Sequence, residues 1–382
     1  HFGQVLQSHA LHFFHLSSPD LLFGYDDEVR HRNIIGVIQD HPELAKQGVL
    51  LRKYGQEVIR LTSGKRIHGT GAIPGGINKC LTLEERDYLL RDSNQIIAWA
   101  ASAVELFKTI FYQQQTYHQQ FASINSHMMS LIQPNGALEL YDGGLRVRKA
   151  DNSLAYDHFD PARYLQLIGE HVEPWSYMKF PFLKALGVAD GWYRVGPLAR
   201  INNCDFIDTP LAEQQRQQFK TLNNGLPVQY TLAYHWTRMI ELLHCAESIA
   251  ALLQDADLLQ GDLTVKGEMQ STGIGVIEAP RGTLIHHYEI DDDGLITRAN
   301  LIVSTTHNNR AMNESIRQVA NRYLSGNQIT EPLLNQLEVA VRAYDPCLSC
   351  ATHALGKMPL EVTLLDQHGA LLDQRIKSTT DG

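Results

Sequence analysis

The stretch DPCLSCATH, residues 345–353, holds two cysteines, Cys347 and Cys350, and a histidine, His353, three residues after the second. A C-x-x-C spacing lets two sulfur atoms reach one metal ion, while nearby backbone amides help to stabilise the thiolates. Thiolates are soft ligands that suit zinc, iron–sulfur clusters, copper(I) or nickel. The spacing therefore indicates a metal site, although two thiolates and one imidazole do not complete a tetrahedral one.

Two structural alternatives stay open at this point. The two cysteines could be buried residues at the start of a helix, or one half of a structural zinc site. A zinc site would need a second pair of ligands, and the sequence has no other C-x-x-C. The remaining cysteines, Cys80, Cys204 and Cys245, are isolated, and we interpret them as small buried hydrophobic residues.

The composition of the 382 residues, 43% hydrophobic and 20% charged, is that of a soluble globular protein. The net charge is −9 and the basic residues are scattered, so neither nucleic acid nor an anionic membrane is expected as a partner. The longest apolar run, residues 96–107, is too short to span a bilayer and contains Glu105. An odd number of cysteines does not indicate a disulfide framework, so we expect a reducing, cytoplasmic compartment.

Hydrophobic periodicity predicts a mainly α fold, with one large helical domain and small β-hairpins. Thr82 and Glu85 have the spacing of a capping box, which predicts the start of a helix that runs to about Gln120. Asp-Gly pairs within alternating segments predict hairpin turns near residues 142–144 and 293–294. Further helical patterns cover residues 1–22, residues from 161 onward, residues 231–253 and residues 313–344.

Three histidines, His9, His12 and His15, recur every third residue near the start of the chain. Such a row could suggest zinc, but no H-E-x-x-H pattern accompanies it. Buried helical histidines are usually hydrogen-bonded core residues, and we interpret these three in that way.

Four stretches together resemble the catalytic large subunit of nickel–iron hydrogenases, most closely the cytoplasmic, NAD-reducing (bidirectional) group. They occur in the family's order and extend the resemblance from the first residue to the tail. The stretches are GQVLQSHALHFFHLSSPDLL (3–22), IHGTGAIPGGINK (67–79), EAPRGTLIHHYEIDDDGLITRANLIVSTTHN (278–308) and DPCLSCATH (345–353).

In that family, four cysteine thiolates hold nickel, and two of them bridge to an iron that carries carbonyl and cyanide ligands. The resemblance implies that Cys347 is the terminal nickel ligand and that Cys350 bridges nickel and iron. It implies that His353 binds a nearby magnesium or similar structural cation.

The resemblance also assigns residues around the metal centre. Arg281 matches the arginine that hangs over the open coordination position, and its fixed, always protonated fork suits that role. Asp20 and Asp345 match the carboxylates that orient this arginine and the thiolates. Pro280 is expected to help build the apolar wall around the diatomic ligands, and His68 matches a family position near the active site.

The reaction implied is reversible, heterolytic cleavage of dihydrogen, with Cys347 or Arg281 taking the proton. Electrons would leave through iron–sulfur clusters on a small subunit and reach NAD through a flavin-bearing diaphorase. The chain itself has neither a G-x-G-x-x-G after a strand nor a cysteine set for an iron–sulfur cluster. These cofactors are therefore expected on partner subunits only.

Other readings are a related cytoplasmic hydrogenase that uses a deazaflavin, NADP or sulfur as acceptor, a quinone-site subunit like that of complex I, and a zinc-stabilised interaction module. The acceptor lies on other chains, so this sequence barely constrains it. Cys347 and Cys350 argue against the complex I reading, and the zinc reading leaves Arg281 and Asp345 without a role.

The sequence departs from the family pattern at both ends. The family's R-x-C-G-x-x-C motif, which carries the other two thiolates, lies upstream of the residue that matches His1, so we expect an N-terminally truncated catalytic domain over residues 1–353 that is inactive alone. Residues 354–382 match an extension that a maturation endopeptidase removes. Cleavage is expected between His353 and Ala354.

Overall fold

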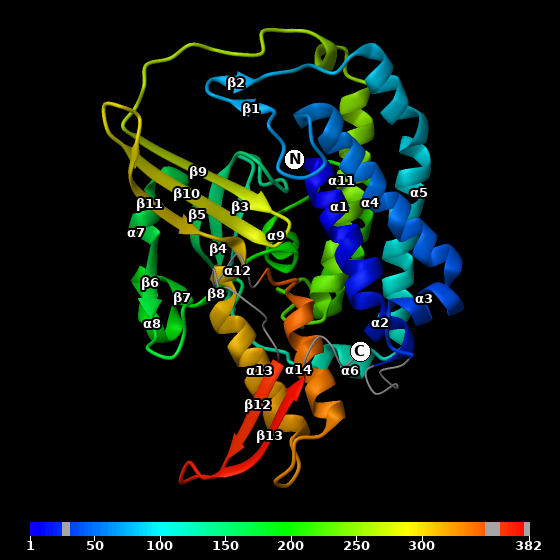
Figure 1. Ribbon diagram of the computed structural model, residues 1–382, viewed down its shortest axis with the longest axis vertical. Coiled ribbons are helices and arrows are strands. Elements are labelled where there is room, and N and C mark those ends of the chain that lie inside the picture. The colour runs from blue at the N-terminus through cyan, green and yellow to red at the C-terminus, as the bar shows by residue number, and fades with distance from the viewer. Residues whose placement is uncertain (25–30, 348–359, 378–382) are drawn as a thin grey trace.

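The computed structural model describes residues 1–24, 31–347 and 360–377 (Figure 1). About half of the chain is helical and about a fifth is strand. The α-helices are α1 (Phe2–Leu11), α2 (Ser18–Phe23), α3 (Ile34–Asp40), α4 (Pro42–Ser63), α5 (Leu83–Gln113), α6 (Gln115–Gln120), α7 (Tyr164–Leu167), α8 (Gly187–Asp190), α9 (Pro197–Asn203), α10 (Pro210–Lys220), α11 (Ala233–Leu253), α12 (Ser304–His307), α13 (Asn309–Tyr323) and α14 (Glu331–Ala343). A π-helix, η1 (His12–Ser17), joins α1 to α2, and short 3₁₀ segments are η2 (Pro161–Arg163), η3 (Lys184–Leu186), η4 (Thr221–Asn223) and η5 (Ala256–Leu259).

The strands of the described residues form five small sheets. The largest has the order β5-β4-β3-β8, with β3 and β8 parallel and the other pairs antiparallel. A three-stranded antiparallel sheet has the order β11-β10-β9, and the remaining pairs are β1-β2, β6-β7 and β12-β13. The strands are β1 (Ala72–Ile73), β2 (Gly76–Ile77), β3 (His127–Ile132), β4 (Gly144–Arg148), β5 (Leu154–Phe159), β6 (Ile168–Val172), β7 (Lys179–Leu183), β8 (Tyr193–Arg194), β9 (Thr272–Ala279), β10 (Gly282–Ile290), β11 (Ile296–Ile302), β12 (Leu360–Leu365) and β13 (Leu371–Lys377).

Helix α11 is the centre of the helical half of the molecule. It is buried on nearly all its faces because α1, α5, α9 and α10 all pack against it. Helices α1, α4, α5 and α11 run side by side in Figure 1. A helix that is apolar on all faces usually lies inside a protein. The few charged residues of α11 are therefore buried with it.

Local sequence signals set the ends of the long helices. Thr82 and Glu85 form the predicted capping box at the start of α5, with hydrogen bonds of 3.2 and 3.0 Å between each side chain and the other residue's backbone N–H. Helix α4 ends at Gly64, which adopts a left-handed conformation with φ of +83°. The predicted helix start at Thr82 is confirmed.

Two segments of the chain contribute residues to the candidate site. The turn between β9 and β10 points into the interior next to α9 (Figure 1), and α14 delivers the chain to residues 345–347. The C-terminal strands β12 and β13 form a hairpin beside α13 and α14, where Leu360, Val362 and Leu364 pack against a second apolar core.

The structure contains more strands than the few hairpins that periodicity predicted. The turn at residues 293–294 is confirmed between β10 and β11, whereas the alternating segment before residue 144 forms only bridges and β4 pairs with β3. The helical pattern from residue 161 was wrong, because this region forms β6 and β7 with only short helices. Short apolar runs do not distinguish a strand from a buried helix, since both bury every side chain. In the described residues, no helix combines the length and apolarity needed to cross a membrane.

Acid is expected to destabilise the fold through its buried histidines. Burial lowers the pKa of His118 and His244 to about 4, and that of His307 to about 3. Unfolded histidine titrates near ~6.5, so below that pH the unfolded chain binds protons that the folded chain excludes. The stabilisation is complete above pH ~6.5 and is lost as pH falls towards 4, at about 1 kcal/mol per pH unit for each histidine.

The measurement is the midpoint temperature of unfolding, followed by circular dichroism between pH 7 and pH 5. The midpoint should fall with pH, and the fall should be smaller in His118→Gln. The exposed Gln113 provides the control, because Gln113→Ala removes no titrating group and should leave the pH dependence unchanged. An equal pH dependence in the wild type and in His118→Gln would contradict this account.

Candidate metal-centre site

Arg281 and Asp345 form a partly buried ion pair where these two segments meet. The Arg281 Nε donates to the main-chain oxygen of Asp345 over 2.6 Å, and its Nη2 donates to Asp345 Oδ1 over 3.1 Å. The arginine side chain is 27% exposed and the carboxylate only 3%, so the guanidinium lies between the carboxylate and the solvent. The structure thus brings together two of the residues predicted from the sequence.

Asp345 carries further signs of a special environment. Its φ is +53°, in the left-handed region that aspartate tolerates better than most residues, and this turns the chain away from α14. Burial raises the pKa of Asp345, while the positive charges of Arg281 and Arg238 oppose that rise. Its Oδ2 is buried without a hydrogen-bond partner in the described part of the chain.

Cys347 lies two residues after Asp345 as a free, half-buried thiol. Its backbone N–H donates to the hydroxyl oxygen of Thr305 on α12 over 3.1 Å. Cys350 and His353, the other predicted ligands, lie outside the described residues. Among residues 1–24, 31–347 and 360–377, no group of three or more His, Cys, Asp or Glu side chains could hold a metal ion.

These features fit a metal group bound by thiolates. A half-exposed thiol is the kind of soft donor that nickel or zinc takes, and it lies close in sequence to a buried carboxylate oxygen that no described residue satisfies. Orphaned buried polar atoms are rare in native proteins and call for a missing partner. Among the described residues, Cys347 is therefore the candidate sulfur donor, and Asp345, the partner of Arg281, lies two residues before it.

The described hydrogen-bond partners of Asp20 are Arg32 and Arg342. Its Oδ1 accepts from Arg32 over 2.7 Å and its Oδ2 accepts from Arg342, near the C-terminal end of α14. No described hydrogen bond joins Asp20 to Arg281. Asp20 is 5% exposed, and through Arg342 its carboxylate ties α2 to the helix that leads into Asp345; a role in orienting Arg281 stays a prediction.

Pro280 and His68 differ in their placement. Pro280 is buried beside Arg281 in the turn between β9 and β10, and its part in an apolar wall stays a prediction. His68 is exposed on the loop after α4, with φ of +53°. The row of early histidines is mostly core, because His9 and His12 are buried and hydrogen-bonded, to Glu241 over 2.8 Å and to the carbonyl of Arg342 over 2.7 Å.

Sequence reasoning missed Arg238. It is fully buried on α11, and its Nη2 donates to the carbonyl of Ala343 over 3.1 Å, two residues before Asp345. Burial lowers the pKa of Arg238 to about 10, and the nearby Asp345 carboxylate partly offsets that effect. The available signal was an arginine inside a mostly apolar helix, because such a charge must find partners in the interior.

Residues 52–353 match the family model described as nickel-dependent hydrogenase. This match covers most of the chain and includes both segments of the site, so the chain belongs to the nickel-dependent hydrogenase family.

The chain is similar to the NAD-reducing hydrogenase HoxS subunit beta of Cupriavidus necator, with 43% identity over 99% of this chain and 79% of that protein. A solved NAD⁺-reducing NiFe hydrogenase in the H₂-reduced state matches with a TM-score of 0.90 and 55% identity, over 92% of this chain and 78% of that one. A NiFeSe hydrogenase of Dm. baculatum, at 20% identity and a TM-score of 0.68 over 92% and 80% of the two chains, shares the fold. The architecture is the large-subunit fold of nickel–iron hydrogenases.

Proposed function

We propose that this chain is the catalytic subunit of a nickel–iron hydrogenase that cleaves dihydrogen reversibly and passes its electrons to NAD. The single observation that carries the proposal is the Arg281–Asp345 pair beside Cys347, within a chain of the nickel-dependent hydrogenase family. The similarity to two NAD-reducing enzymes favours NAD over a deazaflavin, NADP or sulfur as acceptor.

Cys347 and Cys350 would hold the nickel, with Cys350 bridging to an iron that carries carbonyl and cyanide ligands. His353 would bind a magnesium or similar cation. When bound, the bimetallic centre supplies a soft Lewis-acid position at which dihydrogen is polarised. Cys347 is a described free thiol, and metal binding requires it as the thiolate.

The protein's own groups would handle charge and protons around that centre. Guanidinium groups stay protonated in proteins, so Arg281 supplies fixed positive charge over the site. The better proton acceptor is then the sulfur of Cys347, which can take up a proton where an arginine cannot. Asp345 fixes the arginine through two hydrogen bonds, so the charge is preorganised before dihydrogen arrives.

The electrons need acceptors that lie on other subunits. We infer a small subunit with an iron–sulfur cluster and a diaphorase with flavin and an NAD site, in a cytoplasmic complex, because the relatives are NAD-reducing hydrogenases. The acceptor is tested by supplying dihydrogen to the complex isolated with this chain. NAD reduction should exceed NADP or deazaflavin reduction at least about tenfold, equivalent to roughly 1.4 kcal/mol of discrimination.

Metal analysis of the same complex tests the class of site. Nickel and iron are both expected in the fraction that contains this chain. Zinc without nickel would support a structural zinc module instead, and no metal together with quinone binding would support a subunit of the complex I type.

We further propose that residues 354–382 are removed by cleavage between His353 and Ala354. The part of this segment that the structure describes is the β12-β13 hairpin, which packs on the core beside α14 and accepts the backbone N–H of Ile329 at Asp373 over 2.7 Å. Removing the hairpin would release α14 from that contact. The intact mass of the active protein should equal that of a chain whose last residue is His353. An active protein whose mass still includes the hairpin would contradict the proposal.

A further inference from the structure

The guanidinium of Arg200, on α9, is the hub of a buried polar cluster. Its Nε and Nη2 donate to the two oxygens of Glu241 over 2.7 and 2.6 Å, and its Nη1 donates to Glu278 over 2.8 Å. All three side chains are 0% exposed. The cluster thereby joins α9, the central helix α11 and strand β9 through one side chain.

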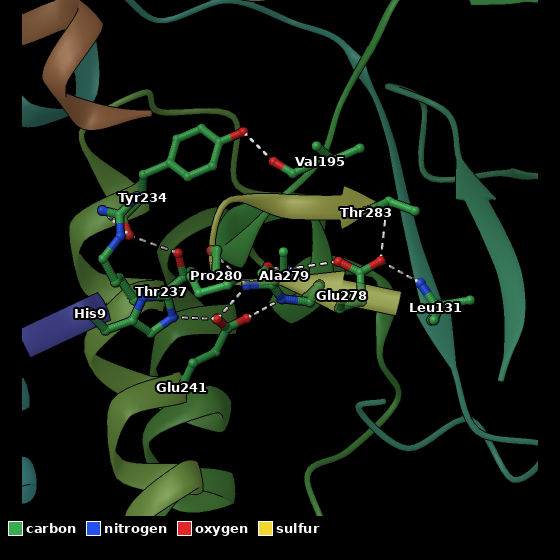
Figure 2. Close-up of polar contacts among 12 residues, drawn as sticks. His9, Leu131, Val195, Tyr234, Thr237, Glu241, Glu278, Ala279, Pro280 and Thr283 are labelled. Atoms are coloured by element: carbon green, nitrogen blue, oxygen red, sulfur yellow. Dashed lines mark hydrogen bonds and ion pairs between the residues drawn. The ribbon is translucent and has the colours of Figure 1, made fainter. Parts of the chain in front are cut away.

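The two carboxylates of this cluster accept further hydrogen bonds (Figure 2). Glu278 also accepts from the hydroxyl of Thr283 over 2.7 Å and from the N–H of Leu131 over 3.0 Å, and Glu241 accepts from His9 Nε2 over 2.8 Å. Burial lowers the pKa of His9 to about 4, so the imidazole is a neutral donor at neutral pH. A buried network of this kind is rigid only while every member is satisfied.

The same guanidinium reaches the turn that carries Arg281. Arg200 Nη1 donates to the carbonyl of Ala279 over 2.9 Å, and Nη2 donates to the carbonyl of Pro280 over 3.2 Å. These two carbonyls belong to the residues directly before Arg281. All five N–H donors of Arg200 are used in holding two carboxylates and two turn carbonyls, so none is left for water or a ligand.

The opposite side of the turn is fixed by close backbone approach. A Cβ added at Gly196 would lie 2.8 Å from the carbonyl oxygen of Arg281, and one added at Gly282 would lie 2.2 Å from a methyl carbon of Val195. The carbonyl of Val195 is itself held by the hydroxyl of Tyr234 on α11 over 2.8 Å. The turn is therefore clamped between the glycine contact on one side and the Arg200 fork on the other.

We propose that Arg200 is a positioning residue for the hydrogenase reaction: its fork holds the Ala279 and Pro280 carbonyls so that Arg281 keeps its guanidinium against Asp345. This inference rests on the proposed function of Arg281. Arg200 does not reach Asp345 or Cys347 and acts only through the turn. A lysine has three donors on one atom and cannot hold two carboxylates and two carbonyls in fixed directions.

The test compares Arg200→Lys, Arg281→Lys and the double variant in the complex isolated with this chain. Arg200→Lys should lower kcat for dihydrogen oxidation about tenfold to a hundredfold, because small misplacements of a catalytic group cost about that much. The KM for dihydrogen and the nickel content should stay within about twofold. Because both changes disable the same guanidinium, the double variant should be within about twofold of Arg281→Lys alone.

A second readout does not depend on activity. Deuterium uptake of the peptide that spans residues 279–282 should rise in Arg200→Lys, while peptides of α5 keep the wild-type rate. Arg146→Lys is the matched control: Arg146 is 4% exposed and bonds Asp157, Asp205 and the carbonyl of Asn203, but none of its described bonds reaches the turn. Its variant should leave uptake at residues 279–282 and kcat unchanged.

If Arg200→Lys does not fold, Thr283→Val takes its place. This variant removes one hydrogen bond to Glu278 and keeps the shape, so it should raise uptake at the turn and lower kcat by about threefold. Unchanged uptake at the turn, or losses in kcat that multiply in the double variant, would overturn the positioning role. If the wild-type complex contained no nickel and did not turn over dihydrogen, the proposed function would be overturned instead. The deuterium uptake would then still test whether Arg200 holds the turn.

Discussion

Replacement of Cys347 by serine is expected to remove nickel from the protein and to abolish dihydrogen-dependent electron transfer. A serine hydroxyl is a harder and far less acidic ligand than a thiol, so it does not replace a thiolate on a soft metal. Loss of partners that only support a metal ligand already costs about 10- to 100-fold in affinity or activity. Loss of a ligand itself should cost more than about a hundredfold, and nickel should fall below about a tenth of the wild-type content.

The matched control for this experiment is Cys80→Ser. Cys80 is also a free, half-buried cysteine, but it lies in the segment between α4 and α5. Nickel measured by plasma mass spectrometry and dye reduction under dihydrogen should both match the wild type in that variant. Nickel at wild-type content in Cys347→Ser would show that this sulfur is not a ligand.

The second large effect is expected from Arg281→Lys, which keeps the charge but loses the fork. The two hydrogen bonds to Asp345 come from Nε and Nη2, and an ammonium on a flexible chain cannot reproduce both. Removing one preorganised donor at a site of developing charge costs about 10²- to 10³-fold in kcat. We expect a loss in kcat of that size with nickel retained, since the arginine is not a ligand.

Arg298→Lys is the control for Arg281→Lys. Arg298 lies on β11 of the same sheet and pairs with Glu289 over 3.1 Å, but its side chain is 60% exposed. Exposed pairs contribute at most about 1 kcal/mol to stability, so this variant should keep both kcat and nickel. Arg281→Lys with wild-type kcat would remove the guanidinium from the mechanism, whereas loss of nickel in that variant would assign it a structural role.

Short motifs indicated the family and pointed to Arg281 and Asp345, which the structure pairs. The spacing of Cys347 after Asp345, and Arg281 after Pro280, identified positions that the fold brings together although about 64 residues separate them in the chain. The capping box at Thr82 was also visible, because this signal depends only on neighbours in sequence.

The buried support of the site could not be predicted in the same way. Arg200, Glu241 and Glu278 lie on three elements, and nothing in their local sequence says that they meet. The partnership of Asp20 with Arg342 spans 322 positions and depends on how α2 packs against α14. Charged residues within apolar segments do indicate that buried partners exist, but only the fold identifies them.

Secondary structure was predicted least well between residues 161 and 195. That region has short apolar runs that form β6, β7 and β8, and β8 pairs in parallel with β3 from far away in the chain. Tertiary contacts rather than local propensity decide such strands. Helix α11 was predicted well, because a long, continuous apolar pattern leaves no competing structure.

Anomalous X-ray diffraction at the nickel and zinc edges, on crystals of the complex isolated with this chain, tests the central claim most directly. The account predicts a nickel signal about 2.3 Å from the sulfur of Cys347, the length of a metal–thiolate bond, with an iron signal beside it and the Arg281 guanidinium above. A zinc signal at Cys347, or nickel bound away from that sulfur and from Arg281, would contradict it.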